Sequence, residues 1–172
     1  MNDTVNMPPM LMAVQGTYHL ELRRANGDVE FFSEGNLIVD EGLDETLDVM
    51  FGGAGQATTW YLGVFAGNYT PVAGVAAATI AAAATESSDY AAGTRPEWQD
   101  AAAASQSKTN SANRASFVFN ATTTIYGAFL VSSNVKQGTG GVLFSASRFS
   151  TAKAVDSGDE LLLTYVINSA SA

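Results

Sequence analysis

Apolar and polar residues alternate along much of this chain, as they do in strands that bury one face and expose the other. The segment TYHLELRR, residues 17–24, alternates in this way, and the Asn26-Gly27 pair that follows is a hairpin-turn signal before the returning run VEFF. A shorter strand pattern, NLIVD, follows at 36–40. Further strand patterns, rich in β-branched and aromatic residues, lie at 58–67, 115–120, 123–133, 141–149 and 160–168. We expect 58–67 to be a central strand.

The clearest strand pair is residues 125–149, where two apolar runs flank the glycine-rich turn in IYGAFLVSSNVKQGTGGVLFSASRF. The segment combines large apolar groups with small hydroxyls and carries little that could do chemistry. We interpret it as a hairpin in the scaffold core. Its small Ser and Ala positions would let a neighbouring sheet or subunit approach closely.

One segment has the period of a helix instead. In DEGLDETLDVMF, residues 40–51, Leu43, Leu47 and Met50 or Phe51 form an apolar stripe at i, i+4 and i+7 or i+8. Asp40 is a suitable N-cap, and the glycines that follow Phe51 would end the helix. The pattern predicts one short α-helix over about 41–51.

Residues 72–115 differ from the rest, since Ala, Ser, Thr and Asn dominate them. Alanine runs favour short helical turns, but the large apolar residues available as anchors are few. They are Val75, Ile80, Tyr90 and Trp98. We therefore expect a long excursion from the core, partly irregular in structure.

The elements together predict a mainly β protein, an antiparallel β-sandwich or jelly-roll-like barrel of about eight strands with one helix. We assign residues 14–172 to this single domain and residues 1–13 to an extended arm. Pro8 and Pro9 disfavour a helix in the arm, and its apolar residues are flexible and adaptable. The arm could lie on its own domain, lie on a neighbour or be disordered, and we take its apolar residues as candidate contacts with another subunit or a partner: Met7, Met10, Leu11 and Met12.

Charge and composition exclude some classes of binding partner and favour others. The formal net charge of −9 repels nucleic acid and suits solubility or docking on a basic surface. With no cysteine, the chain has no disulfide and no cysteine-ligated metal, which fits synthesis in a reducing cytoplasm. No apolar run approaches the roughly 18–20 residues that span a bilayer, so we expect no membrane partner. We read no signal peptide in the first residues.

Candidate chemistry is sparse, and we assign no catalytic, cofactor-binding or metal-binding residue. His19 is the single histidine, on the polar face of a strand pattern, and GGAG and GTGG do not complete a phosphate-binding motif. Five acids fall within residues 40–48, without EF-hand spacing. We interpret them as a solvated helix face, with docking to a basic partner and a metal site as the alternatives. A second acidic group, Asp156, Asp159 and Glu160, frames a turn before the last strand.

The segment TRPEW, residues 94–98, is the most distinctive polar and aromatic group. Arginine and tryptophan often dominate interfaces, so Arg95 and Trp98 are candidate contacts with another subunit or a partner, together with Tyr90. The alternative is that Trp98 folds back and pins the excursion onto its own core.

The second half of the chain resembles small virion structural proteins of tailed bacteriophages, nearest to capsid decoration, or cement, proteins. The resemblance rests on WYLGVF, RPEW, FVFN, YGAFLVSS, GVLFSASRF and GDELLLTYV, which mark strands and turns. It implies a β-sandwich or jelly-roll domain that oligomerises on the capsid exterior and clamps neighbouring copies of the major capsid protein. No binding residue carries over.

Three hypotheses follow. The first is a cement protein of the virion, made in the host cytoplasm and forming a homo-oligomer, a trimer in preference to a dimer. The second is a carbohydrate- or receptor-binding module of a head fibre or tail fibre, which would group exposed aromatic residues on one concave face. The third is a polysaccharide-cleaving enzyme with two carboxylates, which would need them about 5–10 Å apart in a cleft.

Overall fold

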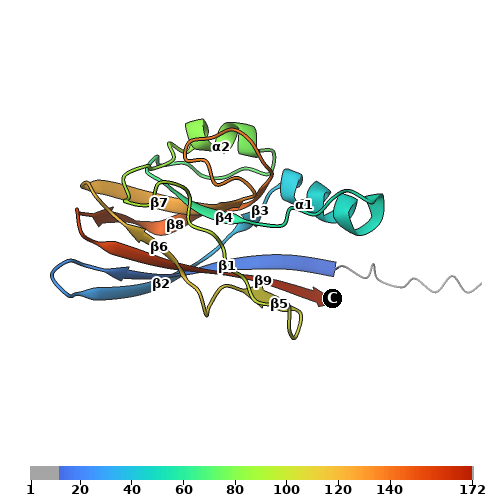
Figure 1. The fold of residues 1–172 in the computed structure, drawn as a ribbon, viewed down its shortest axis with the longest axis horizontal. Helices are drawn as coiled ribbons and strands as arrows, with labels where there is room; N and C mark the ends of the chain where they lie inside the picture. Colours follow the sequence, from blue (N-terminus) through green and yellow to red (C-terminus); the bar gives the residue numbers. More distant parts are fainter. Residues whose placement is uncertain (1–11, 172) are drawn as a thin grey trace, which may run out of the picture.

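The computed structural model of the chain describes residues 12–171, which form two antiparallel sheets packed face to face (Figure 1). One sheet has the strand order β2-β1-β9-β5, with β6 also paired to β9, and the other has the order β3-β8-β7-β4. The elements are β1 (Met12–Arg23), β2 (Val29–Gly35), β3 (Leu37–Ile38), α1 (Asp40–Leu47), the π-helical turn η1 (Asp48–Gly52), β4 (Tyr61–Phe65), α2 (Ala77–Ala83), β5 (Ser107–Thr109), β6 (Ala115–Val118), β7 (Thr123–Val131), β8 (Leu143–Val155) and β9 (Glu160–Ser171). The predicted mainly β fold is confirmed, with one strand and one helix more than we expected.

The first hairpin forms where the sequence predicted it. β1 pairs antiparallel with β2, and Gly27 in the turn has φ +97°, a conformation that glycine adopts without strain. β1 begins at Met12 and pairs with β9 from there, Met12 opposite Ser171. The boundary that we placed between residues 13 and 14 therefore falls inside a strand.

The main core lies between the two sheets and is rich in aromatic side chains. Tyr18 of β1 stacks on Tyr165 of β9, with ring centroids 4.4 Å apart. The Tyr18 hydroxyl lies 2.9 Å from Oγ of Ser145, which belongs to the opposite sheet. Oγ of Ser147 donates to the carbonyl oxygen of Gly35 at 2.6 Å. The small hydroxyls of the 125–149 hairpin thus bond the second sheet to the rest of the same domain.

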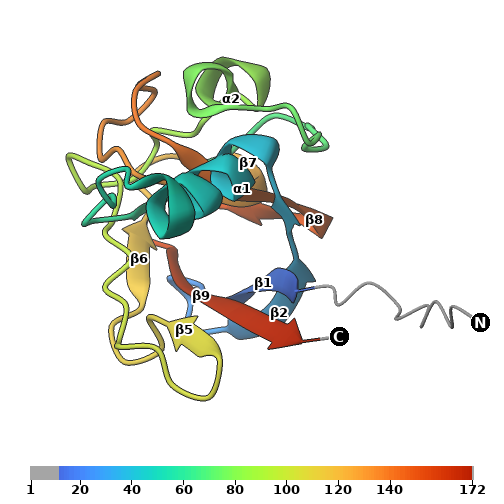
Figure 2. The ribbon, with the colours of Figure 1, turned by 90° about the vertical axis from the view of Figure 1, so that its right-hand side faces the viewer.

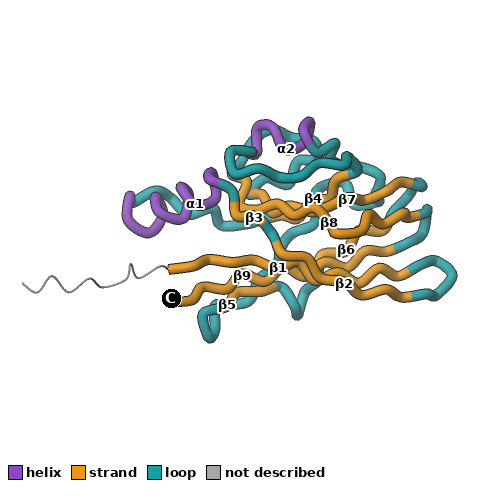
Figure 3. The backbone as a smooth tube through the Cα atoms, turned by 180° about the vertical axis from the view of Figure 1, so that it is seen from behind, coloured by secondary structure: helices purple, strands orange, loops and turns teal. Residues whose placement is uncertain are grey.

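A second core lies on the outer face of the β3-β8-β7-β4 sheet, where α2 covers it (Figure 3). Ile80 of α2 is fully buried there with Phe65 and Phe129. The Phe65 ring packs over Gly127, where an added Cβ would lie 2.0 Å from the ring. The domain therefore has three layers, in which α2 covers one sheet and that sheet packs on the other. The alanine-rich excursion contributes the helical layer.

The excursion covers the free edge of β4. β4 ends its sheet, so our expectation of a central strand was wrong. The excursion supplies the missing backbone partners: Leu62 N–H to Pro96 O at 2.8 Å, Trp98 N–H to Trp60 O at 2.8 Å, and Ser87 N–H to Val64 O at 2.9 Å. The predicted anchors Val75, Ile80, Tyr90 and Trp98 are all buried, with exposed fractions of 0 to 4%.

Candidate interaction surface

The helical segment formed by α1 and η1 projects at one end of the sandwich (Figure 1). It begins one residue earlier than predicted, because Val39 and not Asp40 occupies the N-cap position, and Asp40 lies in the first turn. Gly53, in a left-handed conformation with φ +73°, ends it as a C-cap. The segment therefore extends over residues 40–52 as one rod with a wider last turn.

Two contacts fix the rod to the sandwich. The Glu41 carboxylate accepts hydrogen bonds from the backbone N–H of Ala77 at 2.8 Å and of Leu143 at 2.7 Å. Gly42 packs so closely on β8 that an added Cβ would lie 2.5 Å from the carbonyl oxygen of Phe144. Gly42 is the buried residue of α1, so the rod is held by its first turn and not by its apolar stripe.

The apolar stripe of the rod faces solvent. The exposed fraction is 42% for Leu43, 52% for Leu47, 56% for Met50 and 78% for Phe51. We call these four residues the helix surface. An amphipathic helix on a globular domain normally turns such a stripe to the core, and a contiguous exposed apolar patch marks an interaction site.

Hollows flank the helix surface on both sides. One of about 170 Å³ lies between η1 and the β-sandwich and is lined by Met50, Trp60 and Phe144. Another, of about 240 Å³, continues past Trp60 toward Ile167. On the other side, Leu43 borders a hollow of about 490 Å³ together with Val14 and Leu37. This end of the molecule is therefore uneven, and apolar side chains contribute to the lining of each hollow.

Carboxylates accompany the apolar stripe. Asp44, Glu45 and Asp48 lie on the same rod, and its last turn has no basic residue. Among the described residues, no group of three acidic or histidine side chains could hold a metal ion. The surface therefore combines apolar contact area with negative charge and offers no metal centre.

The predicted contact residues of the excursion are buried within the domain. This corrects our expectation that they contact another subunit or a partner. Tyr90 is 1% exposed, Arg95 1% and Trp98 3%. The Trp98 indole N–H donates to the carbonyl oxygen of Tyr165 at 3.1 Å. The alternative reading, in which Trp98 pins the excursion to its own core, is the one that the structure supports. Trp60, which lies in the segment that we expected to be a central strand, is the more exposed tryptophan and only borders that core.

Of the predicted arm contacts, Met7, Met10 and Leu11 lie outside the described residues. Met12 begins β1, where its backbone pairs with Ser171. The helix surface was absent from our candidate contacts. The sequence contained the signal for this surface, because the apolar stripe that predicted the helix consists of the same residues that are exposed in the structure.

Arg95 forms the most deeply buried polar cluster, with Glu86. The two side chains are fully buried and form two hydrogen bonds. Arg95 Nε donates to Glu86 Oε1 at 2.8 Å, and Arg95 Nη2 donates to Glu86 Oε2 at 2.7 Å. Arg95 also donates to the carbonyl oxygen of Ser133 at 2.9 Å, and Glu86 accepts from the backbone N–H of Gln137 at 2.8 Å. The pair locks the excursion to the loop between β7 and β8, a structural role.

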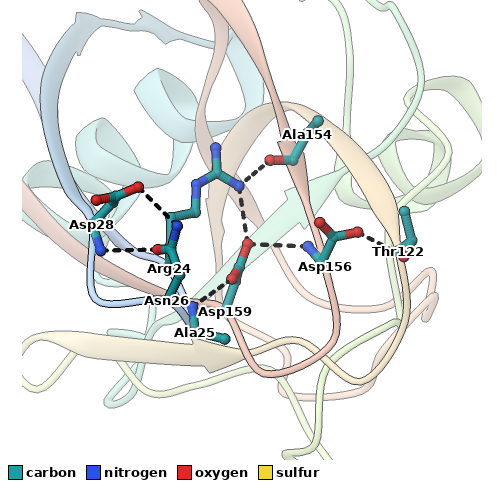
Figure 4. A network of polar contacts seen from close by, with 8 residues as sticks. All are labelled: Arg24, Ala25, Asn26, Asp28, Thr122, Ala154, Asp156 and Asp159. Atoms are coloured by element: carbon teal, nitrogen blue, oxygen red, sulfur yellow. Dashed lines mark hydrogen bonds and ion pairs between the residues drawn. The ribbon is translucent and has the colours of Figure 1, made fainter.

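The second acidic group also has a structural role (Figure 4). Asp159 is 3% exposed and accepts from the backbone N–H of Ala25 at 2.8 Å and from Arg24 at 2.9 Å. Burial alone would raise the pKa of Asp159, but the N–H groups of Ala25 and Asp156 and the Arg24 guanidinium together lower it. The carboxylate joins the β1–β2 turn to the β8–β9 turn, as expected of acids that frame a turn.

No family model matches the chain, and no curated protein matches it. No helix within residues 12–171 is long and apolar enough to cross a membrane.

Proposed function

We propose that this chain is a non-enzymatic structural protein of a bacteriophage virion. In this proposal it is a cement or decoration protein with a jelly-roll-like sandwich that binds the outer capsid surface. It forms a homo-oligomer and clamps neighbouring copies of the major capsid protein. The observation that carries the proposal is the helix surface, an exposed apolar stripe on a rod that its first turn attaches to a well-packed domain. The sequence resemblance supplies the particular assembly.

The positions of the two most exposed aromatic side chains favour an assembly protein over a carbohydrate-binding module. Phe31 and Phe51 are the aromatic residues among the exposed large apolar side chains of the described chain. Phe31 belongs to β2 and Phe51 to η1, and Figure 1 draws these elements toward opposite ends of the domain. They do not form the grouped aromatic platform that a sugar-binding face needs.

The carboxylates whose pKa is shifted are bound in structural ion pairs. Hydrogen bonds from Arg114 and Arg23 lower the pKa of Glu21, and the partners described above lower that of Asp159. A general acid needs a raised pKa, so neither group is prepared for the proton transfer that glycoside hydrolysis requires.

The test is the presence of the protein in gradient-purified phage particles at a high copy number related to the capsid symmetry, measured by quantitative mass spectrometry. Purified protein should also rebind particles that have been stripped of it. Phe51→Ser should reduce this rebinding at least tenfold, whereas the matched control Phe31→Ser should not. Absence from particles, or equal loss in both variants, would overturn the proposal.

A further inference from the structure

We propose that the helix surface receives residues 7–11 of a second copy of this chain. The inference rests on the proposed function as an assembly protein and names the partner of the same surface. It starts from the hollows on both sides of the stripe, which an apolar segment with flexible side chains could fill.

The segment ahead of β1 has the chemistry of such an occupant. It contains Met7, Met10 and Leu11, and its only charged side chain is Asp3. Methionine is unbranched and fits irregular apolar gaps, and Pro8-Pro9 favours an extended backbone with little entropy to lose on binding. Fully extended, eleven residues span up to about 36 Å, enough to reach a neighbouring molecule.

The start of β1 lies at the same end of the domain as the helix surface. Val14 of β1 and Leu43 of α1 line one hollow, and Figure 2, which looks onto this end of the domain, shows α1 at one sheet and the beginning of β1 in the other. An arm from a copy that docks at this end therefore begins close to the surface that it would occupy. Two copies could exchange arms reciprocally, or three could do so in a ring.

The chain's own arm is the competing occupant, because β1 begins at Met12, opposite Ser171, at the same end of the domain as the helix surface. An experiment that separates links between copies from links within one chain therefore decides between the two.

Charge distinguishes this occupant from a basic partner. Each copy has a formal net charge of −9, so two copies repel each other and their association should strengthen as salt screens the repulsion. Docking of a basic partner on the acidic rod should weaken with salt instead. Light scattering between about 50 mM and 500 mM salt distinguishes the two.

The absence of cysteine allows a clean crosslinking experiment on the full chain. Met10→Cys protein is mixed with isotope-labelled Leu47→Cys protein and treated with a short bismaleimide. The expected product has twice the 17.9 kDa mass, with a peptide pair joining position 10 of one copy to position 47 of the other. Met10→Cys mixed with Phe31→Cys is the matched control, since Phe31 is 73% exposed but lies on β2.

A link between copies at 10 and 47, at least fivefold stronger than at 10 and 31, supports the inference. No link, equal links in both mixtures, or a link that forms only within a single chain carrying both cysteines overturns it. Removal of residues 1–11 should abolish the oligomer and leave the domain folded. If arms do not exchange but the protein still decorates particles, only this inference fails. If arms exchange and particles do not bind the protein, the proposed function fails.

Discussion

The excursion at 72–115 and the rod formed by α1 and η1 contrast in how the domain holds them. The excursion has few large apolar residues, yet backbone bonds to β4 and a fully buried ion pair attach it. The rod has a regular apolar stripe, yet Gly42 and Glu41 attach it while the stripe stays exposed. An apolar pattern thus identifies a helix without identifying what covers it, and an alanine-rich segment can be firmly held through its main chain.

The largest expected effect is at the ion pair that holds the excursion. Arg95→Met should lower the free energy of unfolding by about 3–5 kcal/mol, because Glu86 would remain buried without its partner. Urea denaturation followed by tryptophan fluorescence measures this loss. The double variant with Glu86→Gln should recover a substantial part of it. A loss below about 1 kcal/mol would show that the main-chain bonds alone hold the excursion.

The next largest effect is expected at the two tryptophans, which should differ in how much their replacement lowers the free energy of unfolding. Trp98→Ala should cost about 3 kcal/mol, the lower end for a buried tryptophan, because the side chain borders a hollow that allows some relaxation. Trp60→Ala should cost less, since Trp60 is only partly buried. Denaturation curves of both variants at one protein concentration test the order, and the reverse order would contradict our assignment of Trp98 to the core.

A smaller effect depends on pH. The pKa of Asp159 is lowered in the folded protein, so its contribution is fully present above the unfolded pKa of about 4 and is lost as the pH falls through the folded value. Asp159→Asn should cost about 2 kcal/mol at pH 7, the scale of charge-assisted hydrogen bonds. The difference between variant and parent should shrink below about pH 4 in denaturation curves measured down to pH 2.5. A constant difference would mean that the Asp159 side chain acts through packing and not through its charge.

The smallest expected change in stability is on the rod. Phe51→Ser should alter the free energy of unfolding by no more than about 0.5 kcal/mol, because the ring is 78% exposed. Denaturation curves of this variant and the parent measure the change.

Hydrogen exchange compares how firmly the excursion and the rod are held. Amides bonded to β4, such as Trp98 N–H, should be protected far more than those of η1. Equal protection in the two regions would show that the domain holds the rod as firmly as the excursion.

The sequence predicted strands well wherever side chains alternate, since that alternation follows from burying one face of each strand. It predicted the first hairpin from Asn26-Gly27 and the strand pair at 125–149. It misplaced 58–67 as a central strand, because a covered edge strand is as apolar as an interior one. It missed the Arg95–Glu86 pair, since nothing in two charges nine residues apart shows that backbone pairing with β4 will bury both.

The pairing of β1 with β9 has a consequence for the order of folding. These strands join residues 12–23 to residues 160–171 at the centre of their sheet, and β5 and β6 also pair with β9. Closing so long a loop is entropically costly and slow, and contacts this distant in sequence are typical of domains that fold in milliseconds to seconds. During synthesis, the first sheet cannot be completed until the residues of β9 have left the ribosome. The β7–β8 hairpin, whose partners are close in sequence, can pair well before that.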